Sequence, residues 1–402
     1  MRENVSHADD RGAPGAHPAP AGGARVPAVR ARASGHDQGG RGARPRPQQR
    51  LGDRDRGAAE GGAAPRRDRA AADRRARAPL PALGAHPRGP LACVVNIGHE
   101  RWQVAAVELG GRAVRETSGR RPGPGPAAVL GVLSERVAEA RAAYGRRLRA
   151  VSVAVAGTAV GTTIVQASGL GWRDVSFEPL RPAPDVPLLV GNDASLAGLA
   201  EARRGAGAGA RAVLHLTVEV GVGGVLIVDG RPVNGATGAA GEFGHMPFGD
   251  PALECPCGAS GCWDLEVDGR AMARVLGLPP PRDPRTEAER IIAAAGSDPA
   301  SRRAVAAAAR ALGRGAGALV NALDPDRVTL SGLGPGIAAV AGEELDRALR
   351  AGLMSFRRAA PPPLLPSTLG PHSTLVGAAE AAFDQVLSDE GLAAWTATAA
   401  SD

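Results

Sequence analysis

The chain has 402 residues and a formal net charge of +7, but the charge is local: residues 1–90 carry 18 arginines against 9 acidic residues, and residues 91–402 carry 30 against 32. This length suffices for two or three domains with a sizeable core. The chain lacks both a run of ~20 apolar residues and a secretory signal, which excludes membrane and secreted classes and predicts a cytoplasmic protein with reduced thiols and no membrane partner.

Residues 1–90 consist mostly of Ala, Gly, Pro, Arg and Asp and contain no Ile, Phe, Tyr, Trp or Thr. Such a segment cannot bury enough apolar surface to offset its chain entropy, so we predict that it is disordered. An arginine-rich arm that neutralises nucleic-acid phosphates and a solvated tail without function are both open interpretations.

Ordinary globular sequence begins near Leu91. The apolar run 91–98, the segments 102–109 and 112–116 and the glycine pair between them predict three strands joined by a hairpin. Apolar residues at helical spacing over 126–147 predict a helix, and 148–156 reads as the next strand.

The chain then continues through a predicted strand at 162–166 and a turn at 169–172, where we expect Trp172 to pack on a domain surface. A short strand at 186–190 leads into a helix over 194–203. Asp193 precedes that helix, where a carboxylate can cap the first turn or accept hydrogen bonds.

The second half repeats the alternation of strands and helices. We predict its strands and helices from apolar runs, periodicity and glycine-containing turns. The predicted strands are 211–220, 225–228 and 326–330, and the predicted helices are 285–295, 300–323, 342–353 and 374–387. Residues 389–402 are expected to form a flexible tail.

Three of the four cysteines, Cys255, Cys257 and Cys262, follow His245 within 17 positions. Thiolate and imidazole are the ligands that zinc prefers, and four of them close a tetrahedral site. A buried thiol cluster and a disulfide are the alternatives, although a disulfide between Cys255 and Cys257 closes an awkwardly small ring. We therefore predict a structural Zn²⁺ held by His245 and the three cysteines.

The run GATGAAGEFGHM followed by CPCGASGC resembles the signature of the ROK family, which includes bacterial sugar kinases and sugar-responsive repressors. The resemblance extends over about residues 91–388. It implies an α/β, two-lobed actin-like ATPase (RNase H-like) fold, which we divide into a first lobe at 91–200 and a second lobe with the zinc loop at 201–388.

The same resemblance implies a sugar site. Asn192 and Asp193 match the family's Asn-Asp-Ala, whose Asp is the general base of the kinases. Glu242 and His245 match residues that contact sugar hydroxyls. Asp264 stands where the family has a sugar-contacting Glu, and Glu266 is an alternative for that role.

This chain departs from the pattern of the ROK kinases at two places in the phosphate site. The kinases place Asp-x-Gly-x-Thr where this chain has Asn96-Ile-Gly98-His-Glu, and Gly-Thr-Gly where it has Glu219-Val-Gly221. Losing the first carboxylate weakens a magnesium site, and a carboxylate at 219 repels phosphate. We class Asn96, Gly98, Glu219, Gly221 and Gly223 as remnants of a phosphate loop.

The retained sugar residues and the altered phosphate residues together favour a ROK-family transcriptional regulator, repressor-like, that binds a monosaccharide or sugar phosphate as a homodimer or homotetramer. The alternative is an ATP- and Mg²⁺-dependent hexose kinase of the glucokinase type, with Asp193 as base.

Family regulators carry a winged helix-turn-helix before the first lobe, but residues 1–90 show no such pattern. DNA binding would therefore use a domain not recognisable in this chain, and we favour a wrongly framed remnant of that domain over a tail or an arm.

Overall fold

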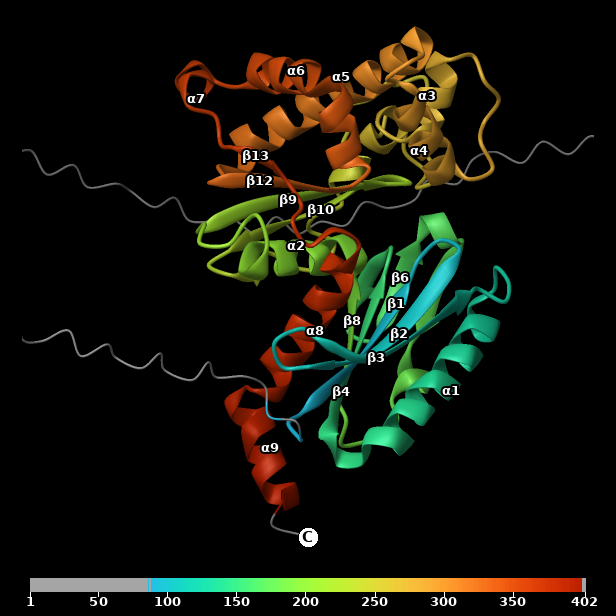
Figure 1. The fold of residues 1–402 in the computed structure, drawn as a ribbon, viewed down its shortest axis with the longest axis vertical. Coiled ribbons are helices and arrows are strands. Elements are labelled where there is room, and N and C mark those ends of the chain that lie inside the picture. The colour runs from blue at the N-terminus through green and yellow to red at the C-terminus, as the bar shows by residue number, and fades with distance from the viewer. Residues whose placement is uncertain (1–85, 87, 400–402) are drawn as a thin grey trace, which may run out of the picture. The chain divides into compact units, whose positions relative to one another are not determined.

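The computed structural model describes residues 86 and 88–399, and the predictions made for residues 1–85 lie outside the described residues. The described part is an α/β structure built on two five-stranded sheets, drawn in Figure 1. The sheets have the orders β3-β2-β1-β4-β8 and β11-β10-β9-β12-β13. In each, two antiparallel pairings are followed by two parallel ones, so the halves repeat one topology.

The strands of the first sheet are β1 (Leu91–Ile97), β2 (Arg101–Glu108), β3 (Ala113–Arg120), β4 (Leu148–Val155) and β8 (Leu188–Asn192). The predicted hairpin and the strand at 148–156 are confirmed. Strands β1, β4 and β8 run parallel, with Ile97 opposite Val155 and Val155 opposite Asn192. Their carboxyl ends therefore meet at one edge, where Gly98 and Asp193 also follow.

Both faces of the first sheet are buried, because successive side chains of a strand point to opposite faces. Helix α1 (Pro126–Tyr144) covers the face that carries Cys93 and Val95. Helix α8 (Ser373–Val386) covers the other face, on which Ala92 and Val94 lie. The first sheet is thus completed by a helix from the far end of the sequence.

A small antiparallel sheet follows β4 and consists of β5 (Thr158–Val160), β6 (Thr163–Ala167) and β7 (Trp172–Ser176). The sequence predicted only the middle strand. The expectation that Trp172 packs on a domain surface is wrong: this residue is 2% exposed and lies in the core between α1 and the first sheet. Its indole nitrogen donates to the carbonyl of Pro124 over 2.7 Å, which satisfies its one polar atom.

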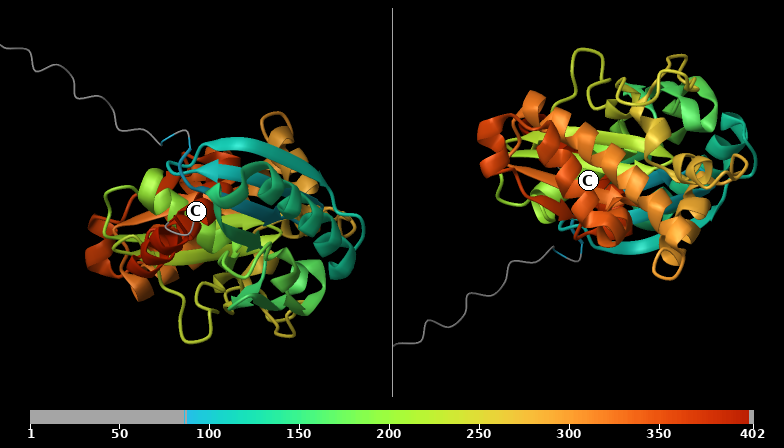
Figure 2. Two further views of the ribbon diagram at one scale, coloured as in Figure 1. Left: turned by 90° about the horizontal axis from the view of Figure 1, so that it is seen from below. Right: turned by 90° about the horizontal axis from the view of Figure 1, so that it is seen from above.

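The strands of the second sheet are β9 (Ala212–Glu219), β10 (Gly221–Val228), β11 (Arg231–Pro232), β12 (Arg327–Gly332) and β13 (Leu364–Pro366). Its helices are α3 (Gly269–Val275), α4 (Pro284–Ala294), α5 (Pro299–Leu323), α6 (Gly334–Gly352) and α7 (Ser355–Ala359). Figure 2 shows α5 and α6 lying over this sheet when the molecule is seen from above. Helix α6 begins eight residues before the predicted helix, and Ala341 interrupts its helical backbone.

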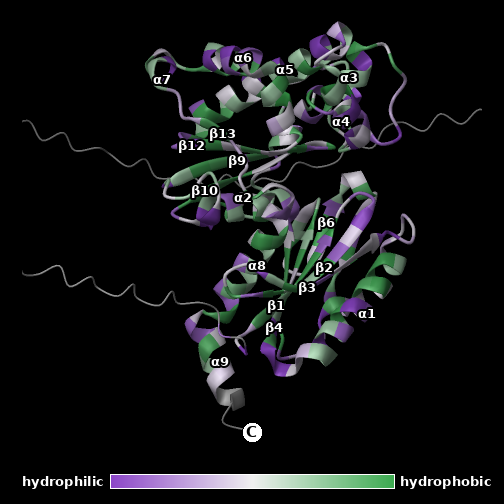
Figure 3. Ribbon diagram, viewed as in Figure 1, coloured by the Kyte–Doolittle hydropathy of each residue, from purple (hydrophilic) through white to green (hydrophobic). Residues whose placement is uncertain are grey.

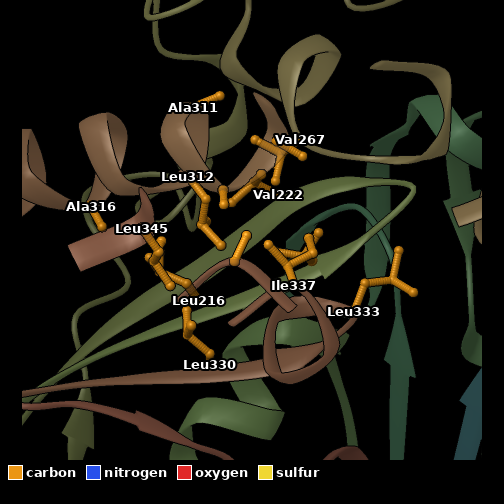
Figure 4. Close-up of a cluster of buried hydrophobic side chains, with 14 of the residues drawn as sticks. Leu216, Val222, Val267, Ala311, Leu312, Ala316, Leu330, Leu333, Ile337 and Leu345 are labelled. Atoms are coloured by element: carbon orange, nitrogen blue, oxygen red, sulfur yellow. The ribbon is translucent and has the colours of Figure 1, made fainter. Parts of the chain in front are cut away.

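The core of the second half lies between the sheet and α5 and α6. Figure 4 shows Leu216 and Leu330 of the sheet facing Leu312 of α5 and Leu345 of α6. The hydrophobic strands and the hydrophilic outer turns of the helices are seen in Figure 3. Among the helices of residues 88–399, none is both long and apolar enough to cross a bilayer.

Helix α2 (Asp193–Arg204) and helix α8 pack against one another between the two sheets. Leu199 and Ala202 of α2 lie against Val225 and Ile227 of the second sheet. The crossing with α8 is close, because a Cβ on Gly377 would lie 1.7 Å from the Leu196 carbonyl oxygen. Only glycine permits this approach, so Gly377 determines how closely α8 packs against α2, the helix that begins at Asp193.

No helix was predicted in the expected tail, whereas Asp389–Ala399 form helix α9. The hydroxyl of Ser388 accepts from the Gly391 amide over 3.1 Å, and two acidic residues occupy the first turn. The Trp395 ring lies 5.3 Å from the Arg149 guanidinium, which joins the helix to β4.

Candidate functional site

The side chains of His245, Cys255, Cys257 and Cys262 converge, with their ligand atoms all within 4.8 Å of one another. Cys257 Sγ lies 3.7 Å from Cys262 Sγ, and Cys255 Sγ lies 3.8 Å from Nδ1 of His245. A tetrahedron with Zn–S bonds of about 2.3 Å has edges of about 3.8 Å. The donor set and its spacing therefore fit a closed zinc site.

The backbone of this loop holds the cysteines in place. The amide of Cys255 donates to Ala259 over 2.8 Å, and the amide of Gly258 donates back to Cys255 over 2.9 Å. Gly258 has a φ of +99°, a conformation that side-chain-bearing residues rarely adopt. After the last cysteine, the buried Trp263 donates from its indole to the Ala311 carbonyl of α5 over 2.9 Å, which anchors the loop to the core.

Asn192 and Asp193 lie where β8 ends and α2 begins. The Asn192 side chain caps the helix by accepting from the Ser195 amide over 3.0 Å. Asp193 is the first residue of the helix, and one of its oxygens accepts from the Ala194 amide over 2.8 Å. Burial raises the pKa of Asp193 to about 6, and the negative charge of Glu242 adds to this rise. A carboxyl with this pKa exchanges a proton readily near neutral pH.

Glu242 links the two halves of the structure. Its carboxylate accepts a hydrogen bond from the Thr158 hydroxyl of β5 over 2.8 Å. The other oxygen lies 3.9 Å from Nε2 of His245, and its charge acts on Asp193. The structure therefore brings Asp193, Glu242 and His245 into one polar cluster, with Nδ1 of the imidazole directed to the cysteines and Nε2 to Glu242.

Asp264 is less exposed than Glu242, with 15% of its side chain exposed against 36%. One oxygen accepts from the Val222 amide of β10 over 2.6 Å, and the other lies 3.6 Å from Nδ1 of His245. Burial raises the pKa of the Asp264 carboxyl, and the bond from Val222 opposes that rise. Cβ atoms on Gly221 or Gly244 would overlap its carboxylate, so both glycines are needed for its position.

Residues 219–224, which we call the glycine turn, join β9 to β10, and side chains of the protein itself occupy this turn. Glu219 forms an ion pair with Arg285 of α4, and Gly332 packs against the same carboxylate. Gly223 contacts Ala194, the neighbour of Asp193, since a Cβ there would lie 2.7 Å from the Ala194 Cβ. Glu219 and Gly221 are directly paired, so β9 and β10 turn over Val220 alone.

The other two residues that the sequence analysis predicted as phosphate-loop remnants, Asn96 and Gly98, lie at the end of β1 and in the turn after it. Asn96 is the last residue but one of β1 and lies opposite Gln103 and Ala154, and the Gly98 amide donates to the Arg101 carbonyl over 2.8 Å. The charge of His99 in the same turn contributes to the lowered pKa of Asp283, although hydrogen bonds from Thr286 are the larger cause. This turn therefore lies on the side of Asp283, the N-cap residue of α4.

Three groups that contact the candidate site residues were not predicted from the sequence: Thr158, Arg285 and the backbone amide of Val222. Thr158 lies in a strand that was not predicted, and it is 84 residues from Glu242. Arg285 opens a helix that was predicted, but nothing in its local sequence marks a partner at Glu219. The sequence feature that points to Arg285 is the carboxylate at 219, because a carboxylate in a glycine turn calls for a cationic partner.

The two sheets of like topology, with a helix pair between them and polar residues at the strand ends, define the actin-like ATPase fold. The model of the ROK family matches residues 92–385. The chain therefore belongs to the ROK family.

Proteins with similar sequences include both kinases and repressors. A glucokinase of Streptomyces coelicolor is 34% identical over 155 residues, which are 37% of this chain and 47% of that protein. The xylose repressor of Bacillus subtilis is 27% identical over 114 residues, 28% of this chain and 30% of the repressor. The chain thus spans about half, or less, of the length of these relatives.

Among solved structures, a ROK family glucokinase of Streptomyces griseus in complex with glucose and AMPPNP superposes with a TM-score of 0.63 at 27% identity. The match covers 73% of this chain and 99% of the glucokinase. The similarity therefore extends over nearly the whole of that glucokinase chain.

Proposed function

We propose that this chain is a sugar-sensing transcriptional regulator that binds a monosaccharide or sugar phosphate between its two sheets without transferring phosphate to it. The observation that carries the proposal is the ion pair between Glu219 and Arg285 in the glycine turn. The pair holds the Glu219 carboxylate at the position where the resemblance implies a phosphate of ATP. A carboxylate at this position repels the phosphate, because both are negatively charged.

The polar cluster supports the sugar part of the proposal. Asp193, Glu242 and His245 offer acceptors and a ring nitrogen within one region, and hydroxyl-rich ligands need such convergent groups. Zinc on Nδ1 of His245 would fix the ring and leave Nε2 for a sugar hydroxyl. When bound, the metal supplies loop order, and the protein side chains make the contacts to the sugar.

The state of the glycine turn supports the absence of phosphoryl transfer. Asp264 takes up the Val222 amide, one of the backbone donors that a phosphate would need. Asn96 replaces the carboxylate that serves magnesium in the kinases, so the metal–nucleotide pair loses an anionic ligand. Regulation would follow from a sugar-dependent shift between conformations of a DNA-binding homodimer or homotetramer.

Calorimetric titration with a panel of monosaccharides and their 6-phosphates, beside a coupled ADP-release assay, tests this proposal. We expect saturable binding of one sugar class, weakened by Glu242→Gln, and no turnover with Mg-ATP. Sugar-dependent ADP release at about 1 s⁻¹ or faster, a rate typical of an enzyme, would overturn it.

A hexose kinase remains the second candidate, because burial raises the pKa of Asp193 to about 6. A general base is most effective when its pKa lies near the working pH. The same carboxylate also suits a sugar-binding site, whereas the Glu219 carboxylate is unfavourable only for nucleotide binding. For this reason we rank the kinase second.

A further inference from the structure

A cavity of about 240 Å³ lies between α3 and α5, and none of its lining residues belongs to the polar cluster of Asp193, Glu242 and His245. Alanines form much of its wall, and Arg310 and Arg314 of α5 lie on it together with Glu266. The volume is below the 300–1,000 Å³ common for ligand pockets, so the cavity suits a compact ligand rather than a nucleotide.

The two arginines carry uncompensated charge. The side chains of Arg310 and Arg314 are exposed, and neither has a hydrogen bond or ion pair within the described part of the chain. They are four residues apart on one helix, so their guanidinium groups lie on the same face and repel each other. Helix α5 contains no acidic residue in 25 positions that would relieve this repulsion.

The one carboxylate on the cavity is already engaged. Glu266 lies 3.3 Å from Arg274 and accepts from the Asp250 amide over 3.2 Å. Arg274 therefore offsets the charge of Glu266, and the balance at the cavity stays positive. Two guanidinium forks can together hold a tetrahedral oxyanion through several charge-assisted bonds.

We propose that this cavity is an anion site for a small phosphomonoester, with Arg310 and Arg314 binding the phosphate and the alanine and Val275 side chains contacting its short carbon body. The proposal is independent of the sugar-binding function. Because Glu266 also accepts from the zinc loop at Asp250, an occupied cavity would lie directly behind that loop.

The test uses the full chain, with inorganic phosphate and glycerol 3-phosphate as probes in calorimetric titrations at constant ionic strength. We expect one saturable site for each probe. The double variant Arg310→Gln and Arg314→Gln should weaken both affinities at least about tenfold, because bonds to charged groups are strong.

The matched control is Arg303→Gln with Arg347→Gln, which removes the same charge from two exposed arginines outside the cavity. It should change the affinities less than about twofold, because neither arginine lines the cavity and their longer-range charge is screened. Absence of saturable binding, equal weakening by both double variants, or displacement of glycerol 3-phosphate by a short DNA duplex would each overturn the proposal. Melting curves of all variants establish that they fold.

Discussion

The hydroxyl of Thr158 donates to the carboxylate of Glu242 over 2.8 Å, across 84 residues of sequence. This bond ties the small sheet beside the first half to the loop that precedes the cysteines. Replacing Thr158 with the similarly shaped valine removes the donor and keeps the packing volume.

We expect Thr158→Val to lower the free energy of unfolding by about 1 kcal/mol, the net worth of one hydrogen bond. Affinity for the sugar should fall roughly fivefold, because Glu242 loses the contact that orients it. Chemical denaturation and calorimetric titration measure the two effects. Unchanged sugar affinity would show that Glu242 does not need this support.

The Glu219–Arg285 pair gives a prediction for nucleotide binding. Glu219→Gln removes the charge that opposes phosphate, so affinity for Mg-ADP should rise at least about tenfold. Both side chains are partly exposed, and loss of the pair should cost under about 1 kcal/mol of stability. Fluorescence titration with a nucleotide analogue reports the change.

Glu289→Gln is the matched control, because Glu289 also pairs with Arg285, over 3.0 Å, but lies on α4 outside the glycine turn. It should leave nucleotide affinity unchanged. Equal gains in both variants would mean that overall charge, not the turn, excludes the nucleotide.

The raised pKa of Asp193 predicts a pH dependence with a defined sign. Its folded pKa of about 6 exceeds the ordinary 3.8, so the contribution to stability is fully present below pH 4 and is lost as pH rises through 6. Asp193→Asn should therefore be more stable than the parent by up to about 3 kcal/mol at pH 8. Denaturation at several pH values should show this gain vanishing near pH 4.

Sugar binding should show the opposite trend. An ionised carboxylate accepts a hydrogen bond from a sugar hydroxyl, so affinity should rise from pH 5 to pH 7 in the parent and stay level in Asp193→Asn. A parent protein with level affinity over this range would place Asp193 outside the sugar contacts.

Metal removal tests the zinc site. We expect one zinc per chain by elemental analysis, and its loss in Cys257→Ser. Without metal the loop keeps few apolar contacts, so proteolysis near residues 250–260 should accelerate and sugar affinity should fall at least tenfold. Cys93→Ser is the control, because Cys93 is buried in the first sheet and away from the cluster. Full zinc content in Cys257→Ser would contradict the assignment.

Two glycines test the α2–α8 crossing. Gly377→Ala forces a methyl group against the Leu196 backbone and should destabilise the protein by about 3 kcal/mol. Gly131→Ala in α1 meets nothing within 4 Å and should stabilise by about 0.5–1 kcal/mol. Thermal melts compare the pair, and similar melting temperatures would show that the crossing yields easily.

The sequence allowed prediction of features that depend on local chemistry. Periodicity located α1, α5 and α8, and ligand type with spacing located the four zinc-binding candidates. It failed where distant contacts decide the structure. Strand β7 begins at Trp172 after a glycine pair that resembles a turn, and its burial does not alternate regularly. No local pattern indicates that Arg285 reaches Glu219 or that Thr158 reaches Glu242.

The position of helix α8 determines which fragments of the protein can fold. It supplies the cover for Ala92 and Val94 from residues 373–386, so the first sheet draws on both ends of the folded region. A fragment that stops after α2 would leave one side of that sheet bare to water and should aggregate. Truncation from the carboxyl end therefore uncovers the first sheet, and we expect that the two halves do not fold as separate pieces.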